Sequence, residues 1–212
     1  MRRVIQATPG KGVKVLADAS SNSVRNRELE KALSSSGIDI TKFDVWQMKE
    51  LKKGLKSGVD YQIYANPKFN EYQMRELREG LEEGLDVEVY ANPAFDEKQM
   101  YQIREGMKSD VDVSWYADPR YTWGQMGEIL QGLENGLDVS LYADPKFSFP
   151  QMNQIREGME SGVDVSIYAD PRYNWNQMLQ IRVGLENGED VSAYANPKYS
   201  WGQMKKIREG KI

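Results

Sequence analysis

The sequence predicts an all-α solenoid built from 26-residue repeats, and three observations support this prediction. A Gln-Met pair recurs every 26 residues from Met48 to Met204, and an aromatic residue stands five positions before each of these methionines. Each unit divides at its glycines into a longer segment with helical spacing of apolar residues and a shorter second segment. Repeats of this length form solenoids, in which each unit packs only against its neighbours. The alternative is an α/β solenoid with one short strand in each repeat.

The repeats divide the chain into three parts. Six whole units are expected over 43–198, and 199–212 is expected to be a half-repeat that forms a C-terminal cap. Residues 1–42 are expected to form an N-terminal cap, with a degraded repeat helix at 22–36 and a small hairpin within 1–21.

The first segment of each unit carries helix start and stop signals. It begins at a good N-cap residue such as Ser148, and a glutamine three residues later completes a capping box. It ends at a glycine suited to a left-handed conformation in five units and at Asp110 in the third. In the first unit, Met48, Leu51 and Leu55 fall on one side of the helix, and we expect them to form its buried stripe. A further glycine inside each helix is expected to allow close approach of a neighbouring helix.

The second segment, Asp-Val-Ser-x-Tyr-Ala-Asn/Asp-Pro, is open to two interpretations. Its apolar residues alternate, which is typical of a strand. The near-constant positions, however, are Val165, Tyr168 and Ala169, and their spacing is helical. We therefore predict a short α- or 3₁₀-helix with Asp164 as its N-cap.

Composition excludes several function classes. The 212 residues include no Cys and no His, which removes thiolate nucleophiles, imidazole acid–base chemistry and nearly every structural zinc site. No carboxylate pair stands out, so we expect a protein that is not an enzyme and that holds no cofactor and no metal. Because we find neither a signal peptide nor an apolar run long enough to span a membrane, we expect a cytoplasmic protein.

Three repeated columns could serve either structure or binding. We expect the aspartates equivalent to Asp164 to be N-caps rather than cation ligands, because neighbouring carboxylates would lie about 10 Å apart. The tyrosines equivalent to Tyr168 are expected in the core. The arginines equivalent to Arg156 are expected to pair with glutamates of adjacent units on a solvated face, although such a row could also bind an anion.

The sharpest candidate for recognition is the first position of each long helix, where the units differ. Early units have Val or Glu there, whereas later units have aromatic residues that we expect to reach solvent or a partner, with cations in the preceding loops. The alternative is that these aromatic residues cover the neighbouring loop. Trp115, in the second segment of the third unit, is one further candidate. The predicted partner-binding residues are therefore Trp123, Phe149, Trp175, Trp201, Arg120, Lys146, Arg172, Lys198 and Trp115.

The unit Gln-Met-x-x-Ile-Arg-x-Gly-Leu-x-x-Gly-x-Asp-Val-Ser-x-Tyr-Ala-Asp-Pro, clearest from Gln125 and Gln151 onward, resembles tandem repeats of uncharacterised bacterial proteins. That family occurs in gut Firmicutes and in their mobile elements or phages. The resemblance covers 43–212 and implies a repeat architecture, with no activity attached. It also implies a host or defence protein as one candidate partner.

These observations favour a non-enzymatic protein-binding scaffold. Residues 69–198 carry 11 basic and 24 acidic residues, a formal charge of −13, which would repel a phosphate backbone. One hypothesis is that this acidic region occupies the nucleic-acid groove of a nuclease. The alternative function is nucleic-acid binding along the aromatic and basic edge, because stacking rings and cations together bind single strands.

Overall fold

The computed structural model describes residue 27 and residues 30–211 of the chain. The chain forms two compact units, Met1–Asp44 and Val45–Ile212. The hairpin predicted within 1–21 lies outside the described residues.

The first unit contains a helical stretch and a short 3₁₀-helix among its described residues. Residues 30–35 are helical, and η1 (Ile40–Lys42) follows, with Asp39 as its N-cap. Part of the helix predicted at 22–36 therefore exists, and the rest of that range lies outside the described residues.

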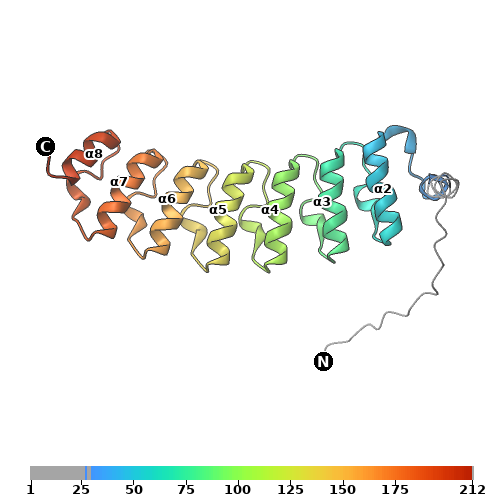
Figure 1. Ribbon diagram of the computed structural model, residues 1–212, viewed down its shortest axis with the longest axis horizontal. Coiled ribbons are helices and arrows are strands. Elements are labelled where there is room, and N and C mark those ends of the chain that lie inside the picture. Colours follow the sequence, from blue (N-terminus) through green and yellow to red (C-terminus); the bar gives the residue numbers. More distant parts are fainter. Residues whose placement is uncertain (1–26, 28–29, 212) are drawn as a thin grey trace, which may run out of the picture. The chain divides into compact units, whose positions relative to one another are not determined.

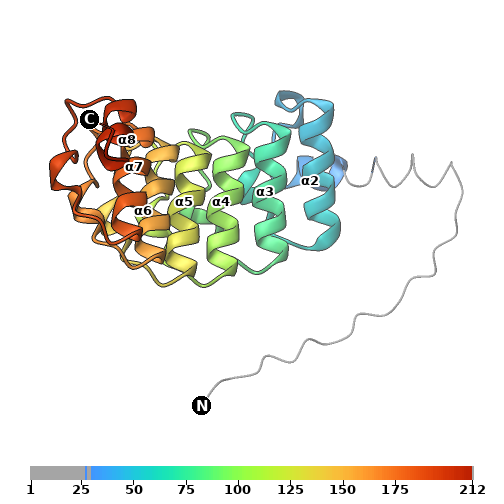
Figure 2. The same ribbon diagram turned by 60° about the vertical axis from the view of Figure 1, so that its left-hand side comes forward.

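The second unit is a row of long helices joined by short 3₁₀-helices, and no strand occurs among the described residues. The all-α prediction is confirmed, and the α/β alternative is wrong. Each long helix packs against the one before it and the one after it in chain order (Figures 1 and 2). The long helices are α2 (Val45–Ser57), α3 (Glu71–Glu82), α4 (Glu97–Lys108), α5 (Trp123–Glu134), α6 (Phe149–Glu160), α7 (Trp175–Glu186) and α8 (Trp201–Arg208). The short ones are η2 (Tyr61–Tyr64), η3 (Val87–Val89), η4 (Val113–Trp115), η5 (Val139–Leu141), η6 (Val165–Ile167) and η7 (Val191–Ala193).

The long helices α3–α8 begin with the predicted capping boxes. In α7 the backbone N–H of Asn174 donates to Gln177 Oε1 at 2.7 Å, and the N–H of Gln177 donates back to Asn174 Oδ1 at 3.0 Å. The predicted left-handed C-terminal positions are also confirmed, including Asp110 with a φ of 56°. The aspartates before η2–η7 are N-caps, each accepting a hydrogen bond from the backbone N–H two residues later.

The capping glutamine has a second role that connects successive repeats. While Gln177 Oε1 caps its own helix, its Nε2 donates to the carbonyls of Pro197 and Tyr199 in the next repeat, at 3.0 and 2.6 Å. Gln47, Gln73, Gln99, Gln125 and Gln151 make the equivalent pair of bonds. One side chain therefore fixes both where a helix starts and where the next loop lies.

The core consists of a few repeated columns. The methionines of the Gln-Met pairs from Met74 to Met204 are fully buried, and so are the tyrosines equivalent to Tyr168, as predicted. In α2 the predicted stripe is only partly buried: Leu51 is inaccessible, while Met48 and Leu55 retain some exposure.

The glycine inside each long helix makes room for a tyrosine of its own repeat. A Cβ at Gly158 would lie 1.9 Å from Tyr168 Oη, and that hydroxyl donates to the carbonyl of Gln154 at 3.1 Å. Gly54, Gly80, Gly106, Gly132 and Gly184 have the same relation to their tyrosines. The expectation that this glycine admits a neighbouring helix is therefore wrong, because the space is filled by the phenol of the following 3₁₀-helix.

A ladder of arginines links successive helices. In α6, Arg156 Nε donates to Glu128 Oε2 of the preceding helix at 2.8 Å, and Nη1 donates to Glu160 Oε1 of its own helix at 2.6 Å. Arg78 is held in the same way, by Glu50 of the preceding helix and Glu82 of its own. Arg104 pairs with Glu76 and Glu83, both of the preceding repeat. Burial alone would lower the pKa of Arg156, but its hydrogen bonds to the two glutamates outweigh that effect and raise it. The predicted pairing of these arginines with glutamates of adjacent units is confirmed. The predicted exposure of the arginines to solvent is wrong, because Arg156 is 6% exposed.

The ladder is interrupted once, between α4 and α5. Leu130 occupies the arginine position, and Gln102 stands where the preceding helix of other junctions has its acceptor. Among the described residues, the side-chain amide of Gln102 has no hydrogen-bond partner.

Candidate interaction surface

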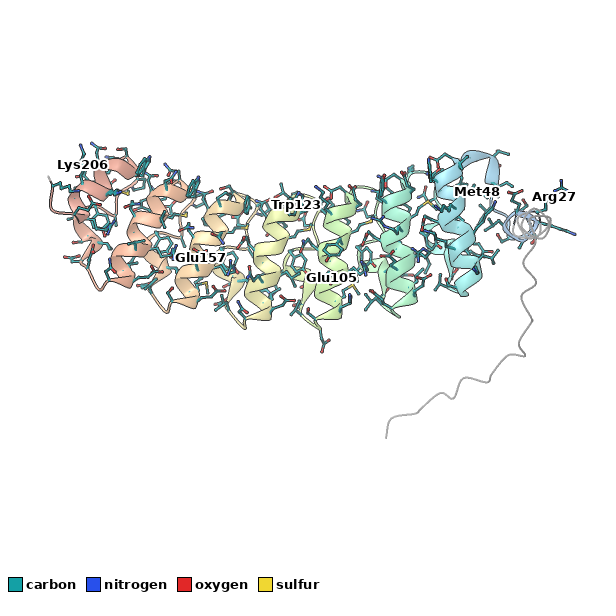
Figure 3. The ribbon with its side chains drawn as sticks, in the orientation of Figure 1. Arg27, Met48, Glu105, Trp123, Glu157 and Lys206 are labelled. Carbon is teal, nitrogen blue, oxygen red and sulfur yellow. The ribbon has the colours of Figure 1, made fainter. Side chains whose placement is uncertain are left out.

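Every long helix of the second unit presents an exposed aromatic side chain within its first five residues. These side chains are 43–59% exposed, in contrast to the buried aromatic columns of the core. We refer to them as the aromatic row: Trp46, Tyr72, Tyr101, Trp123, Phe149, Trp175 and Trp201. Figure 3 shows Trp123 at the upper end of α5, where that helix begins. The aromatic row therefore runs along the N-terminal ends of the helices.

The sequence analysis predicted four members of the aromatic row and missed three. Trp46 and Tyr72 occupy the second position of their helices and Tyr101 the fifth, whereas the prediction considered only the first position of each helix. At 3.6 residues per turn, the first, second and fifth positions share one side of a helix. Comparing the residues that share one side of each helix, rather than one position in each repeat, would have identified these three aromatic residues.

The first-position aromatic residues both cover their neighbour and remain exposed. The ammonium group of Lys98, at the second position of α4, lies 5.1 Å from the ring centre of Trp123. The ring of Phe149 lies against Gly124, at the second position of α5, where an added Cβ would meet it at 3.3 Å. Trp123 and Phe149 thus contact the preceding helix and still expose about half of their side chains to solvent.

The predicted row of cations is largely neutralised within its own loops. Arg120 pairs with Asp118 at 2.6 Å, and Arg172 pairs with Asp170 in the same geometry. Hydrogen bonds from Arg120 lower the pKa of Asp118, as those from Arg172 lower the pKa of Asp170.

The other two loop cations differ from this pattern. Lys146 lies 3.5 Å from Asp144. Lys198 follows Asn196 instead of an aspartate and has no ion-pair partner among the described residues. The loops therefore add little net positive charge beside the aromatic row.

Trp115 belongs to a different element from the aromatic row. It ends η4 and is 41% exposed, as are comparable residues at the same place in other short helices, such as Leu141 and Ile167. No ring contact or hydrogen bond of the described residues joins Trp115 to the aromatic row.

A surface hollow lies at the interruption of the arginine ladder. It encloses about 440 Å³ between the rings of Trp123 and Phe149, with Gly124 and Gly127 in its lining. Polar groups of Gln102, Thr122, Glu128 and Gln131 complete it. Two glycines in one exposed helical turn are unfavourable for the helix itself, so they mark a place where the surface is kept open.

The N-terminal half of the aromatic row has a different chemistry. A hollow of about 400 Å³ between α2 and α3 is lined by Trp46 and Tyr72 and by charged residues, among them Lys49 and Arg75. Lys49 lies over the ring of Trp46 and Arg75 over that of Tyr72, each at 5.4 Å. Both rings are therefore engaged by cations of the protein itself, as the ring of Trp123 is by Lys98.

By contrast, the outward side of α5–α7 next to the aromatic row carries no charge at its second and fifth positions. Those residues are Gly124, Gly127, Pro150, Asn153, Asn176 and Leu179. Carboxylates follow in the C-terminal halves of the same helices: Glu134, Glu157, Glu160 and Glu186. In Figure 3, Glu157 lies lower on the helical face than Trp123. The result is an uncharged aromatic band with an acidic border.

The described residues contain no cluster of three or more His, Cys, Asp or Glu side chains able to hold a metal ion. None of the helices in that part of the chain combines the length and the apolar character that crossing a bilayer requires. Comparisons with protein-family models, with curated proteins and with solved structures find no match.

Proposed function

We propose that the chain is a non-enzymatic protein-binding scaffold whose partner lies across the aromatic row. The observation that carries this proposal is the half-exposed aromatic side chain at the start of all seven long helices of the second unit. Isolated apolar residues on a surface need no explanation, but a continuous set of Trp, Tyr and Phe is typical of interface hot spots.

Charge supports a protein partner over nucleic acid. Arg78, Arg104 and Arg156 are buried against glutamates, so they are not available to phosphates. Arg120 and Arg172 pair with aspartates. Residues 69–198 have a formal charge of −13, and nucleic-acid binding depends on cations that neutralise phosphates.

A host or defence protein is one candidate partner. This choice rests on the resemblance of 43–212 to repeats of mobile-element and phage proteins. An acidic border around an aromatic band suits a partner with a basic surface, such as the nucleic-acid groove of a nuclease.

The test is affinity capture from lysate of the source cell, with and without nuclease treatment. Wild type is compared with Trp175→Ala/Trp201→Ala and with Trp115→Ala, a matched removal of an exposed tryptophan outside the aromatic row. A protein that survives nuclease, is lost with the double variant and is retained with the control supports the proposal. Proteins that disappear after nuclease treatment, with nucleic acid recovered, would overturn it.

A further inference from the structure

We propose that the C-terminal half of the aromatic row, Trp123 to Trp201, binds a proline-rich segment of its partner in the polyproline II conformation, one turn of the segment per repeat. This inference rests on the proposed protein-binding function and names the chemistry of the partner. Four observations carry it: the spacing of the repeats, the unused donors, the hollow beside Trp123 and the charge around it.

The spacing of the repeats matches the period of polyproline II. Packed helices lie about 8–10 Å apart. A polyproline II segment rises about 3.1 Å per residue with three residues per turn, so its side chains repeat about every 9 Å. Successive aromatic residues from Trp123 to Trp201 occupy successive helices, and each can therefore meet the same face of successive turns.

Unused hydrogen-bond donors distinguish this ligand from a helix. The indole N–H groups of Trp123, Trp175 and Trp201 have no acceptor among the described residues, and the amide of Gln102 has no partner. A polyproline II segment makes no internal hydrogen bonds, so its carbonyls are free to accept from such donors. An α-helix has already satisfied its carbonyls and would leave these donors unused.

The hollow between Trp123 and Phe149 has the form that proline rings fill. Its lining includes the rings of Trp123 and Phe149 together with Gly124 and Gly127. An added Cβ at Gly127 would find its nearest neighbour, Gln102 Oε1, at an ordinary 3.7 Å, so the hollow is not required by packing. Grooves lined by aromatic residues are the usual binding places of proline-rich segments.

The charge beside the uncharged band indicates which residues should accompany the prolines of the segment. Glu134, in the C-terminal half of α5, is exposed and has no ion-pair partner among the described residues, whereas Glu160 of α6 pairs with Arg156. A segment with arginines beside its prolines gains attraction from this border, whereas one with glutamates is repelled.

The experiment is a fluorescence anisotropy titration of the full chain against synthetic probes. The main probe is a labelled peptide of four Leu-Pro-Pro triplets with two arginines at one end. Three comparison probes are the same peptide with alanine for proline, a helix-forming peptide of leucine and arginine, and an oligothymidylate. The variants are Trp123→Ala, Gly127→Leu and, as the matched control, Trp115→Ala.

The proposal expects the proline probe to bind more tightly than the alanine probe. Trp123→Ala and Gly127→Leu should each raise the Kd at least about tenfold, as for loss of a hot-spot residue, with Trp115→Ala within about twofold of wild type. Gly127→Leu is informative because leucine favours the helix and its Cβ has room, so binding that is lost while circular dichroism stays unchanged would come from the filled hollow.

The other outcomes separate this inference from the proposed function. If the helical or alanine probe binds equally well and depends on Trp123, the polyproline inference is wrong and protein binding stands. If only the oligothymidylate binds in a Trp123-dependent manner, both are wrong. Absence of proline-probe binding while lysate capture still depends on the aromatic row also overturns the inference alone.

Discussion

Contacts between single residues determine how the core of each repeat packs. The contact between Gly158 and Tyr168 allows a direct test of this packing. Gly158→Ala would place a Cβ 1.9 Å from Tyr168 Oη. Although alanine favours a helix, overpacking should dominate and lower the free energy of unfolding by about 1–3 kcal/mol, measured by urea denaturation.

Two control variants separate crowding from a general effect of the substitution. In Gly127→Ala the new Cβ has room, so stability should stay the same or rise by up to about 1 kcal/mol. On a Tyr168→Phe background, Gly158→Ala should cost less, because the crowding oxygen is gone. Additive losses in the double variant would contradict this account.

Residue patterns predicted the caps well, but they could not predict the crowded contacts. The capping box at Asn174 and the left-handed Asp110 follow from local rules that act within a few residues. That Gly158 receives a phenol from its own repeat depends on how η6 folds back on α6, which is tertiary information. Likewise Arg156 carries a charge, and its burial could be recognised only once the positions of its partners Glu128 and Glu160 were known.

Pairs of elements are linked by the arginine ladder, and the chain contains a natural control for it. Arg156→Leu alone would leave Glu128 nearly buried without its ion-pair partner, and we expect a loss of about 3 kcal/mol in the free energy of unfolding. Glu128→Gln/Arg156→Leu would recreate the Gln102–Leu130 junction. We expect the double variant to lie within about 1 kcal/mol of wild type by urea denaturation. Equal losses in the single and double variants would show that the ion pair itself, rather than the unpaired charge, determines stability.

The elements themselves were predictable, while the extent of the aromatic row was not. The helical spacing of Val165, Tyr168 and Ala169 correctly favoured a short helix over a strand, and in the structure this helix is a 3₁₀ turn over Val165–Ile167. The aromatic row changes its position along the helix between α4 and α5, from Tyr101 to Trp123. Column-by-column comparison of repeats therefore recognised only its C-terminal half.

The whole molecule should unfold cooperatively in alkali, because each repeat buries one tyrosine. Burial raises the pKa of these phenols above the ordinary value of 10.0, to about 12 for Tyr194 and further for Tyr168 and its other equivalents. A pKa raised by folding means that the stabilisation is complete below pH 10, where unfolded tyrosine is neutral, and is lost as the pH rises. Above about pH 10, helical circular dichroism should fall together with the appearance of the part of the tyrosinate absorbance that belongs to these six core phenols. Full tyrosinate absorbance with intact helices would contradict this.

The charge of the whole molecule predicts how its complexes respond to salt. If the partner is basic, as the charge of −13 over 69–198 favours, the Kd of the captured complex should rise as salt is increased. Titration at two ionic strengths measures this, with an uncharged osmolyte as the control for bulk effects. A Kd that does not change with salt would exclude a partner held by its basic surface.

The interruption of the arginine ladder at Leu130 should also determine where the array separates when force is applied to its two ends. Salt bridges join α2 to α3, α3 to α4, α5 to α6 and α6 to α7, while none of the described residues forms one between α4 and α5. That boundary keeps the packing of the two helices, the bonds of Gln99 to the carbonyls of Pro119 and Tyr121, a hydrogen bond from Ser109 to Glu134 and the contact of Lys98 with the ring of Trp123. Of the boundaries from α2 to α7, the one between α4 and α5 should therefore part first under tension. The uncharged half of the aromatic row would then stay together on one intact fragment.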